Sequence, residues 1–386
     1  MRVMPIQRYV VAALFCGLAS MLVILITVST TLRYRAPDIA IKVWPWNGEA
    51  RGVLAGRMLL KGELLGAQQL AKQAVRQVPG DAISLRALGM LQPARETTGK
   101  ALRIMQLATK ASRRDLQTNL WFIEYYVSQG DITSAIRYYD YGLKSSAEAE
   151  SLLFPVLVPA MENLDIAAAV RAKLITRPVW TTSFLQYSFS SGEADDQMIG
   201  IALSMAHDRI GLPIDLKRQY VQRLAERGNL QGLSRFVRGL GQPLLEGTST
   251  LSKIGDFPPA DWRLLSGPDL STFSNSNAGF SFIANQNGTL SERILHLKPG
   301  FYSLHLGLRL DNEERDTRLL WSIACLPDNR IIPISAAVNQ ATFVVSKDNC
   351  SYQKLSLSIK NERLADGLEV SGSVTDMNIK RIHEIP

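Results

Sequence analysis

YVVAALFCGLASMLVILITVSTTL, the stretch from Tyr9 to Leu32, contains 24 residues and no charged side chain. Arg8 precedes it and Arg33 follows it. A helix rises about 1.5 Å per residue, so roughly 20 apolar residues cross the hydrocarbon core of a bilayer. The stretch therefore predicts a membrane-spanning anchor at 9–32, preceded by a cytoplasmic stub at 1–8 and followed by the bulk of the chain.

The anchor is expected to stay uncleaved. A secretory signal peptide has an apolar core of roughly 7–15 residues and a small-residue cleavage site. This run is longer and continues into Thr31-Leu-Arg-Tyr-Arg35, with no Ala-x-Ala. The basic residues on its two flanks are nearly balanced, so the positive-inside rule decides little about orientation.

Cysteine usage bears on the compartment. Cys16 lies inside the apolar stretch, whereas Cys325 and Cys350 lie together in the C-terminal part. Such a pair in a strand-rich region indicates a disulfide and an oxidising environment; two buried free thiols are the alternative. With the short N-terminal stub, the pair predicts that most of the chain lies outside the cytoplasm. In a bacterium this makes it a single-pass protein of the inner membrane, with its bulk in the periplasm.

Composition indicates a folded protein of more than one domain. The chain has 386 residues, of which 46% are hydrophobic and 20% charged, and its net charge is +8. The excess of Lys and Arg lies before Gly255. It favours anionic head groups or an acidic polymer, or it is an ordinary solvated helical surface. No basic run is dense enough to indicate nucleic acid.

A helical repeat is predicted over 38–242. Ala67, Ala101 and Ala135 recur every 34 residues, and Ala169 falls one period later. Small residues at this spacing let paired helices approach closely, and a glycine suits the turn between them. The pattern resembles the tetratricopeptide consensus, although the fourth repeat is degenerate. Helices are also expected at Ala194–Arg209, Ile214–Arg227 and Leu230–Leu240.

The pattern changes after a linker predicted at 243–259. Residues 260–386 contain short segments in which apolar and polar residues alternate, as in Tyr302–Leu310 and Lys354–Ile359. Leu368–Val374 alternates in the same way. This period of two predicts an antiparallel, jelly-roll-like β-sandwich, so the expected fold class is multidomain α + β: an anchor, a tetratricopeptide-like α-solenoid and a sandwich.

Aromatic residues are the candidate contacts for a glycan or a partner protein, with burial in the core as the alternative. They are Tyr125 and Tyr138 in the helical part and Trp262, Phe273, Tyr302 and Tyr352 in the sandwich. Trp321 lies within a predicted strand and is expected in the core. Helical repeat arrays use extended concave surfaces for binding.

No catalytic, cofactor or metal site is predicted. The four histidines lack zinc-type spacing, and no phosphate-binding loop, dinucleotide fingerprint or nucleophile elbow is present in the sequence. Asp195-Asp196 and Glu313-Glu314 are acidic pairs of the kind usually found in solvated turns or at helix starts. The chain is expected not to be an enzyme; the alternative is a periplasmic hydrolase or transferase that modifies a glycan.

The whole layout resembles one class of bacterial envelope protein. Ala40-Ile-Lys-Val-Trp-Pro-Trp-Asn47 follows the anchor, and Trp321-Ser-Ile-Ala-Cys325 with Cys350 follows the repeats. The chain is similar to membrane-anchored tetratricopeptide-repeat proteins encoded with bacterial exopolysaccharide or O-antigen assembly systems. The resemblance implies a non-catalytic accessory role in polysaccharide assembly or export, with envelope proteins and a polysaccharide as the expected partners. It carries over no catalytic residues.

Overall fold

The computed structural model describes residues 5–92, 98–247, 249–250, 254–275, 279–311, 317–337, 340–346, 350–361, 364 and 369–383. The acidic pair Glu313-Glu314 and the start of the predicted stub lie outside these residues. The chain divides into two compact units. The first comprises residues 1–157 and 168–181, and the second comprises 158–167 and 182–386.

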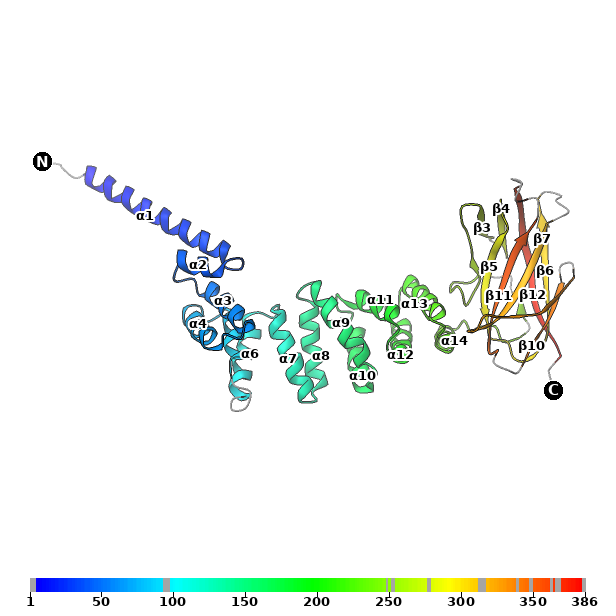
Figure 1. Cartoon of the computed structure of the whole chain (residues 1–386), viewed down its shortest axis with the longest axis horizontal. Helices are drawn as coiled ribbons and strands as arrows, with labels where there is room; N and C mark the ends of the chain where they lie inside the picture. Colours follow the sequence, from blue (N-terminus) through cyan, green and yellow to red (C-terminus); the bar gives the residue numbers. More distant parts are fainter. Residues whose placement is uncertain are drawn as a thin grey trace. The chain divides into compact units, whose positions relative to one another are not determined.

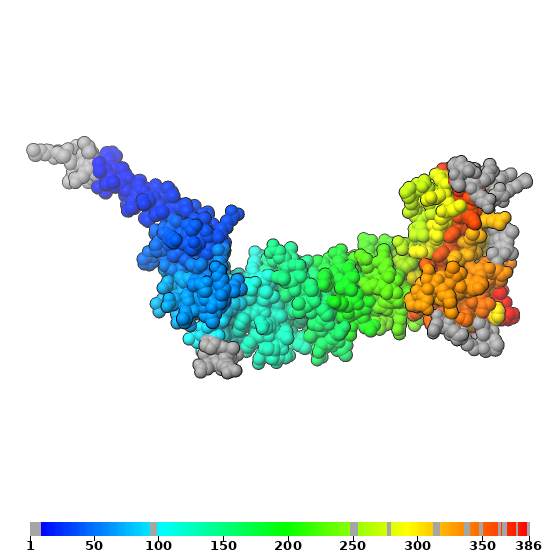
Figure 2. Space-filling view, viewed as in Figure 1, coloured from blue at the N-terminus to red at the C-terminus, as the bar shows by residue number. Residues whose placement is uncertain are grey.

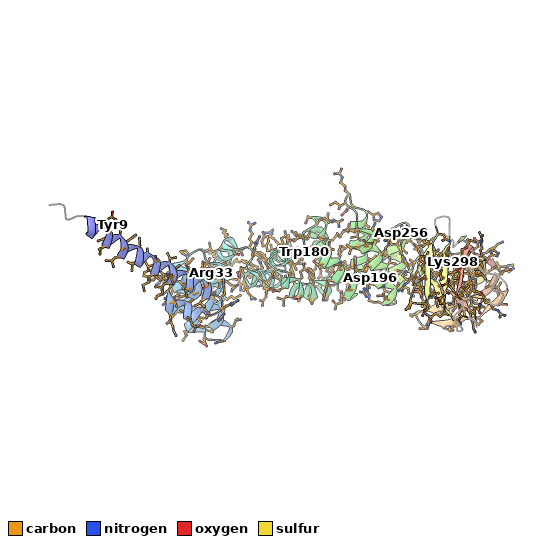
Figure 3. All side chains as sticks on the ribbon, turned by 90° about the horizontal axis from the view of Figure 1, so that it is seen from above. Tyr9, Arg33, Trp180, Asp196, Asp256 and Lys298 are labelled. Atoms are coloured by element: carbon orange, nitrogen blue, oxygen red, sulfur yellow. A yellow bond between two sulfur atoms is a disulfide. The ribbon has the colours of Figure 1, made fainter. Side chains whose placement is uncertain are left out.

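The apolar stretch is one helix. Helix α1 runs from Pro5 to Leu32, so it begins inside the predicted stub. Its segment Tyr9–Leu32 has a mean hydropathy of 2.6 and is largely exposed, apart from the last turns, where Ser29 is buried. Figure 3 labels Tyr9 and Arg33 at the two ends of this segment, and in Figure 2 the helix stands clear of the helices that follow. By length and composition it can cross a membrane.

Thirteen further helices follow among the described residues. They are α2 (Pro37–Val43), α3 (Gly48–Leu60), α4 (Leu64–Gln77), α5 (Ala82–Met90), α6 (Thr98–Ala111), α7 (Leu116–Ser128), α8 (Ile132–Leu143), α9 (Glu148–Ala160), α10 (Leu164–Ile175), α11 (Thr181–Ser191), α12 (Asp195–Ala206), α13 (Ile214–Glu226) and α14 (Leu230–Gly239). Helices α3 to α8 form three consecutive pairs at the predicted period (Figure 1). The helical repeat and the three later helices are confirmed, with ends shifted by up to three residues.

Capping residues determine where several helices begin. Asn47, Asp81, Asp115, Asp131 and Asn229 occupy the N-cap positions of α3, α5, α7, α8 and α14. Each side chain accepts a hydrogen bond from the backbone N–H three residues later, at 2.8 to 3.1 Å. This bond satisfies one of the donors that a helix leaves unpaired at its start.

Close helix packing explains the small residues of the repeat. Ala67, Ala71 and Ala74 lie on one face of α4, and none of them is exposed. Gly62 and Gly130 have φ of 79° and 70° in the turns of the first and third pairs, a conformation that favours glycine. Both sequence predictions are confirmed.

The second unit ends in two antiparallel sheets (Figure 1). The strands are β1 (Ser249–Thr250), β2 (Arg263–Leu264), β3 (Leu270–Ser274), β4 (Phe280–Ala284), β5 (Gly288–Leu295), β6 (Gly300–Leu310), β7 (Arg318–Leu326), β8 (Arg330–Ile332), β9 (Ile334–Ala337), β10 (Gln340–Val345), β11 (Tyr352–Lys360) and β12 (Val370–His383). One sheet has the order β3-β4-β12-β6-β10-β9, with β1 paired to β12, and the other has the order β2-β5-β11-β7-β8.

The core of the sandwich follows the predicted alternation. On β6, Tyr302, Leu304 and Leu306 point inward and are buried, while the intervening Phe301 and His305 are exposed. Strand β11 alternates in the same way, with Leu355, Leu357 and Ile359 buried. The predicted linker differs from expectation in one respect: it contains β1, because Ser249 and Thr250 pair with β12 opposite Ile379 and Asn378.

Candidate binding groove in the helical repeats

The first unit contains a groove with a volume of about 320 Å³. The first helices of the three pairs, α3, α5 and α7, contribute to its walls, and the segment after α1 contributes Tyr34. Its apolar lining includes Val53, Leu59, Leu60, Ile83, Ala87 and Met90. The exposed surface of the lining is mostly apolar, so the groove suits an apolar segment of a ligand rather than a charged one.

Gly56 leaves space in the groove. It lines the groove from α3, and a Cβ built at this position meets no atom within 4 Å. A side chain at this position would enter open space in the groove. Glycine inside a helix costs about 0.5–1 kcal/mol relative to alanine, so local helix stability does not explain it.

Both arginines that line the groove are engaged elsewhere. Arg57 donates to the backbone carbonyl oxygens of Tyr34 and Arg35, the latter at 3.3 Å, and so holds the segment after α1 against α3. Arg86 pairs with Asp115, the N-cap of α7. These contacts fix the walls of the groove and leave its character apolar.

Leucines extend the apolar surface beyond the groove. Leu60 is 90% exposed at the end of α3, and Leu65 is 82% exposed at the start of α4. Leu64 between them in sequence is also exposed. Isolated exposed leucines are ordinary, but three of them around the turn between α3 and α4, of which Leu60 also lines the groove, indicate an interaction surface.

A buried ionic cluster stabilises the end of the first unit. Asp140 on α8 is 3% exposed, and it accepts hydrogen bonds from Lys144 at 2.8 Å, Lys173 at 2.7 Å and the indole of Trp180 at 3.0 Å. Burial by itself would raise the pKa of Asp140, but these three hydrogen bonds outweigh it and lower the pKa below its ordinary value of 3.8. No sequence signal identified this cluster, because its members are up to 40 residues apart.

The two predicted contact residues of the helical part differ in exposure. Tyr138 is 9% exposed and its ring stacks on Phe122 at 4.2 Å, so its prediction as a surface contact is corrected: it belongs to the core between α7 and α8. Tyr125 is half-buried and stacks on Trp121 at 5.3 Å. Neither residue lines the groove.

Burial also corrects two candidates in the sandwich. Trp262 is 1% exposed and Tyr302 is 0% exposed, and both belong to the core, so neither ring is available at the surface. Tyr352 is half-buried and stacks on His296 at 4.9 Å. Phe273 on β3 is 54% exposed and remains a candidate contact.

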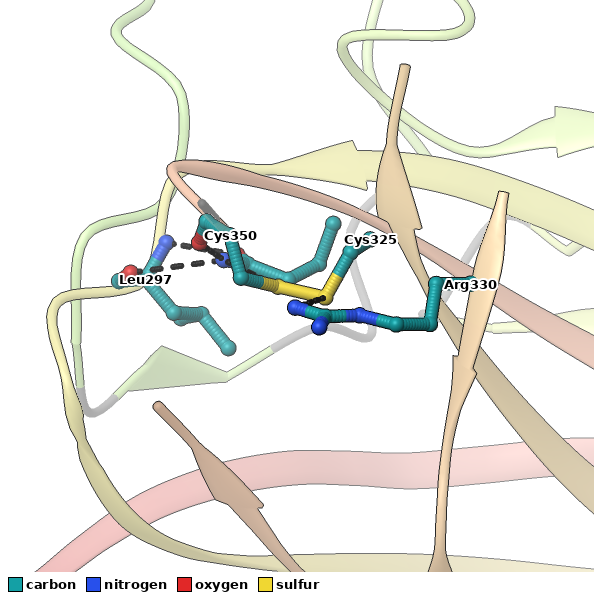
Figure 4. Close-up of a disulfide and its surroundings, with 5 residues drawn as sticks. Leu297, Cys325, Arg330 and Cys350 are labelled. Carbon is teal, nitrogen blue, oxygen red and sulfur yellow. Dashed lines mark hydrogen bonds between the residues drawn. A yellow bond between two sulfur atoms is a disulfide. The ribbon is translucent and has the colours of Figure 1, made fainter. Parts of the chain in front are cut away.

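The predicted cysteine pair is bonded. Cys325 on β7 and Cys350 before β11 form a disulfide with a Cα–Cα distance of 5.1 Å (Figure 4). The buried side chain of Gln353 joins the disulfide to the loop between β5 and β6. Its Nε2 donates to the carbonyl oxygen of Cys350, and its Oε1 accepts from the N–H of Leu297 at 2.8 Å. The sulfurs lie at one end of the core, buried with it.

The described residues contain no group of three or more metal-ligating side chains.

The acidic pair at the start of α12 is engaged in ion pairs: Asp195 with Arg227 at 2.9 Å, and Asp196 with Arg235 at 2.6 Å. Asp195 also accepts from Asn229. These contacts give the pair a structural role in joining α12 to the last helix pair.

Comparisons with known proteins add little. No protein-family profile matches the sequence, and no curated protein matches it. The crystal structure of the P58(IPK) TPR domain is similar at 18% identity over 50% of this chain and 60% of that chain, with a TM-score of 0.24. The structure of Naa15/Naa10 bound to HypK-THB is similar at 15% identity over 57% of this chain and 36% of that one, with a TM-score of 0.25. The chain spans less than two thirds of either structure, and both scores are too low to support an inference.

Proposed function

We propose that this protein is a single-pass membrane-anchored scaffold, an accessory to polysaccharide assembly or export, whose helical repeats bind an envelope protein. The observation that carries the proposal is the apolar groove beside the anchor, in which Gly56 leaves space and which exposed leucines continue. Extended concave surfaces of stacked helical repeats are suited to binding a peptide segment. The polysaccharide context rests on the resemblance in layout alone.

Crosslinking in cells tests the groove. A photo-reactive residue in place of Val53 or Met90 is expected to give an adduct of one and the same mass, because both side chains line the groove. The control carries the photo-reactive residue in place of Gly200 on α12. A side chain there also points into open space, but it lies outside the groove. Adducts at all three positions, or at Gly200 alone, would contradict a specific groove ligand.

The anchor and the disulfide support a periplasmic location for the bulk of the chain. An alkaline phosphatase fused after Pro386 is therefore expected to be active, because that enzyme needs export. A reporter of cytoplasmic exposure at the same place is expected to be silent. The reverse pattern would remove the periplasmic assignment.

The sandwich is proposed to contact the glycan. Its strand order, β4-β12-β6-β10 in one sheet and β5-β11-β7-β8 in the other, is the interleaved order of a jelly roll, an architecture found in lectin domains. The exposed ring of Phe273 supplies an apolar surface for a sugar.

Affinity electrophoresis of the detergent-solubilised chain tests this contact. Gels that contain the polysaccharide of the producing bacterium are expected to retard the wild type and to retard Phe273→Ala less. Leu320→Ala is the matched control, because Leu320 is 42% exposed on the other sheet. Equal retardation of all three proteins would count against this face.

A further inference from the structure

The end of α1 is joined to the first repeat by buried hydrogen bonds. Ser29 lies one turn before the end of α1 and is 0% exposed. Its hydroxyl donates to the carbonyl of Ala40 on α2 at 2.8 Å and accepts from Nδ2 of Asn47 at 2.8 Å. Asn47 is also the N-cap of α3. The hydroxyl of Ser29 therefore connects α1 to α2 and to the start of α3. The last turn of α1 and the start of the repeat are therefore one rigid joint.

The position of this joint agrees with the thickness of a bilayer. Twenty residues of the apolar segment of α1, from Tyr9 to Val28, precede Ser29. At about 1.5 Å per residue they extend over about 30 Å, the thickness of the hydrocarbon core. Ser29 then falls at the boundary of that core. Thr30 and Thr31, the next residues, satisfy their hydroxyl groups by donating to carbonyls of the preceding turn.

Large apolar side chains surround the joint and remain exposed. Tyr34 is 53% exposed, Ile39 on α2 is 47% exposed and Trp46 is 73% exposed. We call these three residues the foot. Helix α2 lies beside the end of α1 (Figure 1), and the bond from Ser29 to Ala40 holds it there.

We propose that the foot inserts into the head-group region of the same bilayer that α1 crosses. This rests on the membrane anchor of the proposed function. Tyr and Trp are enriched at membrane interfaces because one part of the ring is apolar and the other forms hydrogen bonds. The foot follows α1 directly in the chain, and the bond from Ser29 to Ala40 holds α2 beside the last turn of α1, so the foot lies where α1 leaves the bilayer.

Charged residues at the foot agree with this depth. Arg35 before α2 and Lys42 on α2 are exposed and can reach lipid phosphate groups. Asp38 on α2 is also exposed, and its negative charge offsets part of this attraction. Arg33 pairs with Glu49 and lies over the ring of Tyr34 at 4.7 Å. Because Tyr34 also lines the groove, insertion of the foot holds the groove at the membrane surface.

Quenching by brominated lipids tests the foot in the full chain reconstituted into vesicles. Trp44→Phe leaves Trp46 as the tryptophan of the foot, and Trp44→Phe/Trp46→Phe removes it; the other four tryptophans are common to both proteins. Bromine in the upper acyl chain is expected to quench the first protein and to leave the double variant nearly unchanged. Equal quenching of the two would overturn the foot. Extraction of both proteins by alkaline carbonate would overturn the anchor, and the foot with it, so the two failures are distinguishable.

Discussion

Replacing Asp140 by Ala is expected to lower the free energy of unfolding of the first unit by about 2–4 kcal/mol. The carboxylate is buried and accepts from two lysines and from the indole N–H of Trp180. The variant removes the acceptor shared by all three donors and leaves two ammonium groups close together. Denaturant unfolding followed by tryptophan fluorescence measures the loss, because Trp180 is itself part of the cluster.

Asp131→Ala is the matched control. Asp131 is exposed and caps the same helix by accepting from the N–H of Ser134 at 3.0 Å, so its loss is expected to cost less stability than the loss of Asp140. An equal, small effect of the two substitutions would mean that the buried cluster adds no stability beyond that of an ordinary helix cap.

The same cluster predicts a dependence on pH. The folded-state pKa of Asp140 lies below the ordinary value of 3.8, so its ionised form stabilises the fold above pH 3.8. This contribution is lost as the pH falls through the lowered pKa. The difference in stability between the wild type and Asp140→Asn is therefore expected to be constant near neutral pH and to shrink below pH 3.8. A difference that grows on acidification would have the wrong sign.

Replacing Cys325 by Ser is expected to destabilise the sandwich by about 2–5 kcal/mol. The disulfide joins two positions 25 residues apart, and its loss frees the unfolded chain to sample more conformations. The first unit is compact by itself and is expected to unfold as before. Calorimetry of the two variants Cys325→Ser and Cys350→Ser, with Cys16→Ser as the control, measures the effect.

Thiol labelling gives the complementary result. In protein taken from the cell, unfolded without reductant, we expect label only at Cys16, which is the free cysteine. Label on all three cysteines would show that the bond does not form in the cell. The orientation would then rest on the short N-terminal stub alone.

Local patterns account for the parts of the fold that the sequence predicted. Three local patterns in the sequence predicted these parts. They are the continuous apolar run at 9–32, the helical spacing of the alanines in α4 and the alternation of the leucines in β6. Gly62 and Gly130 likewise mark turns through their own backbone requirements. These features need no knowledge of distant neighbours.

The remaining features depend on contacts between distant residues. The groove is lined by Tyr34, which Arg57 holds through its backbone, together with residues of α3 and α5. The ionic cluster joins Asp140 to Trp180, 40 residues later in the chain. The sequence shows that Trp262 and Tyr302 lie in a β-region, but not which face of a sheet each occupies. Tyr302 is buried through the pairing of β6 with β12, which comes much later in the chain, and Trp262, which precedes β2, packs against Trp321 of β7 with ring centroids 6.4 Å apart.

Filling the groove is the most direct test of the scaffold. Gly56→Trp places an indole in the open space of the groove, and Gly200→Trp makes the same change on α12, where a Cβ also meets no neighbour. Both substitutions replace a helical glycine, so neither is expected to reduce stability. Each is combined with the photo-reactive residue at Met90. The account predicts that Gly56→Trp abolishes the adduct at Met90 and that Gly200→Trp preserves it; an adduct of undiminished yield in Gly56→Trp would contradict it.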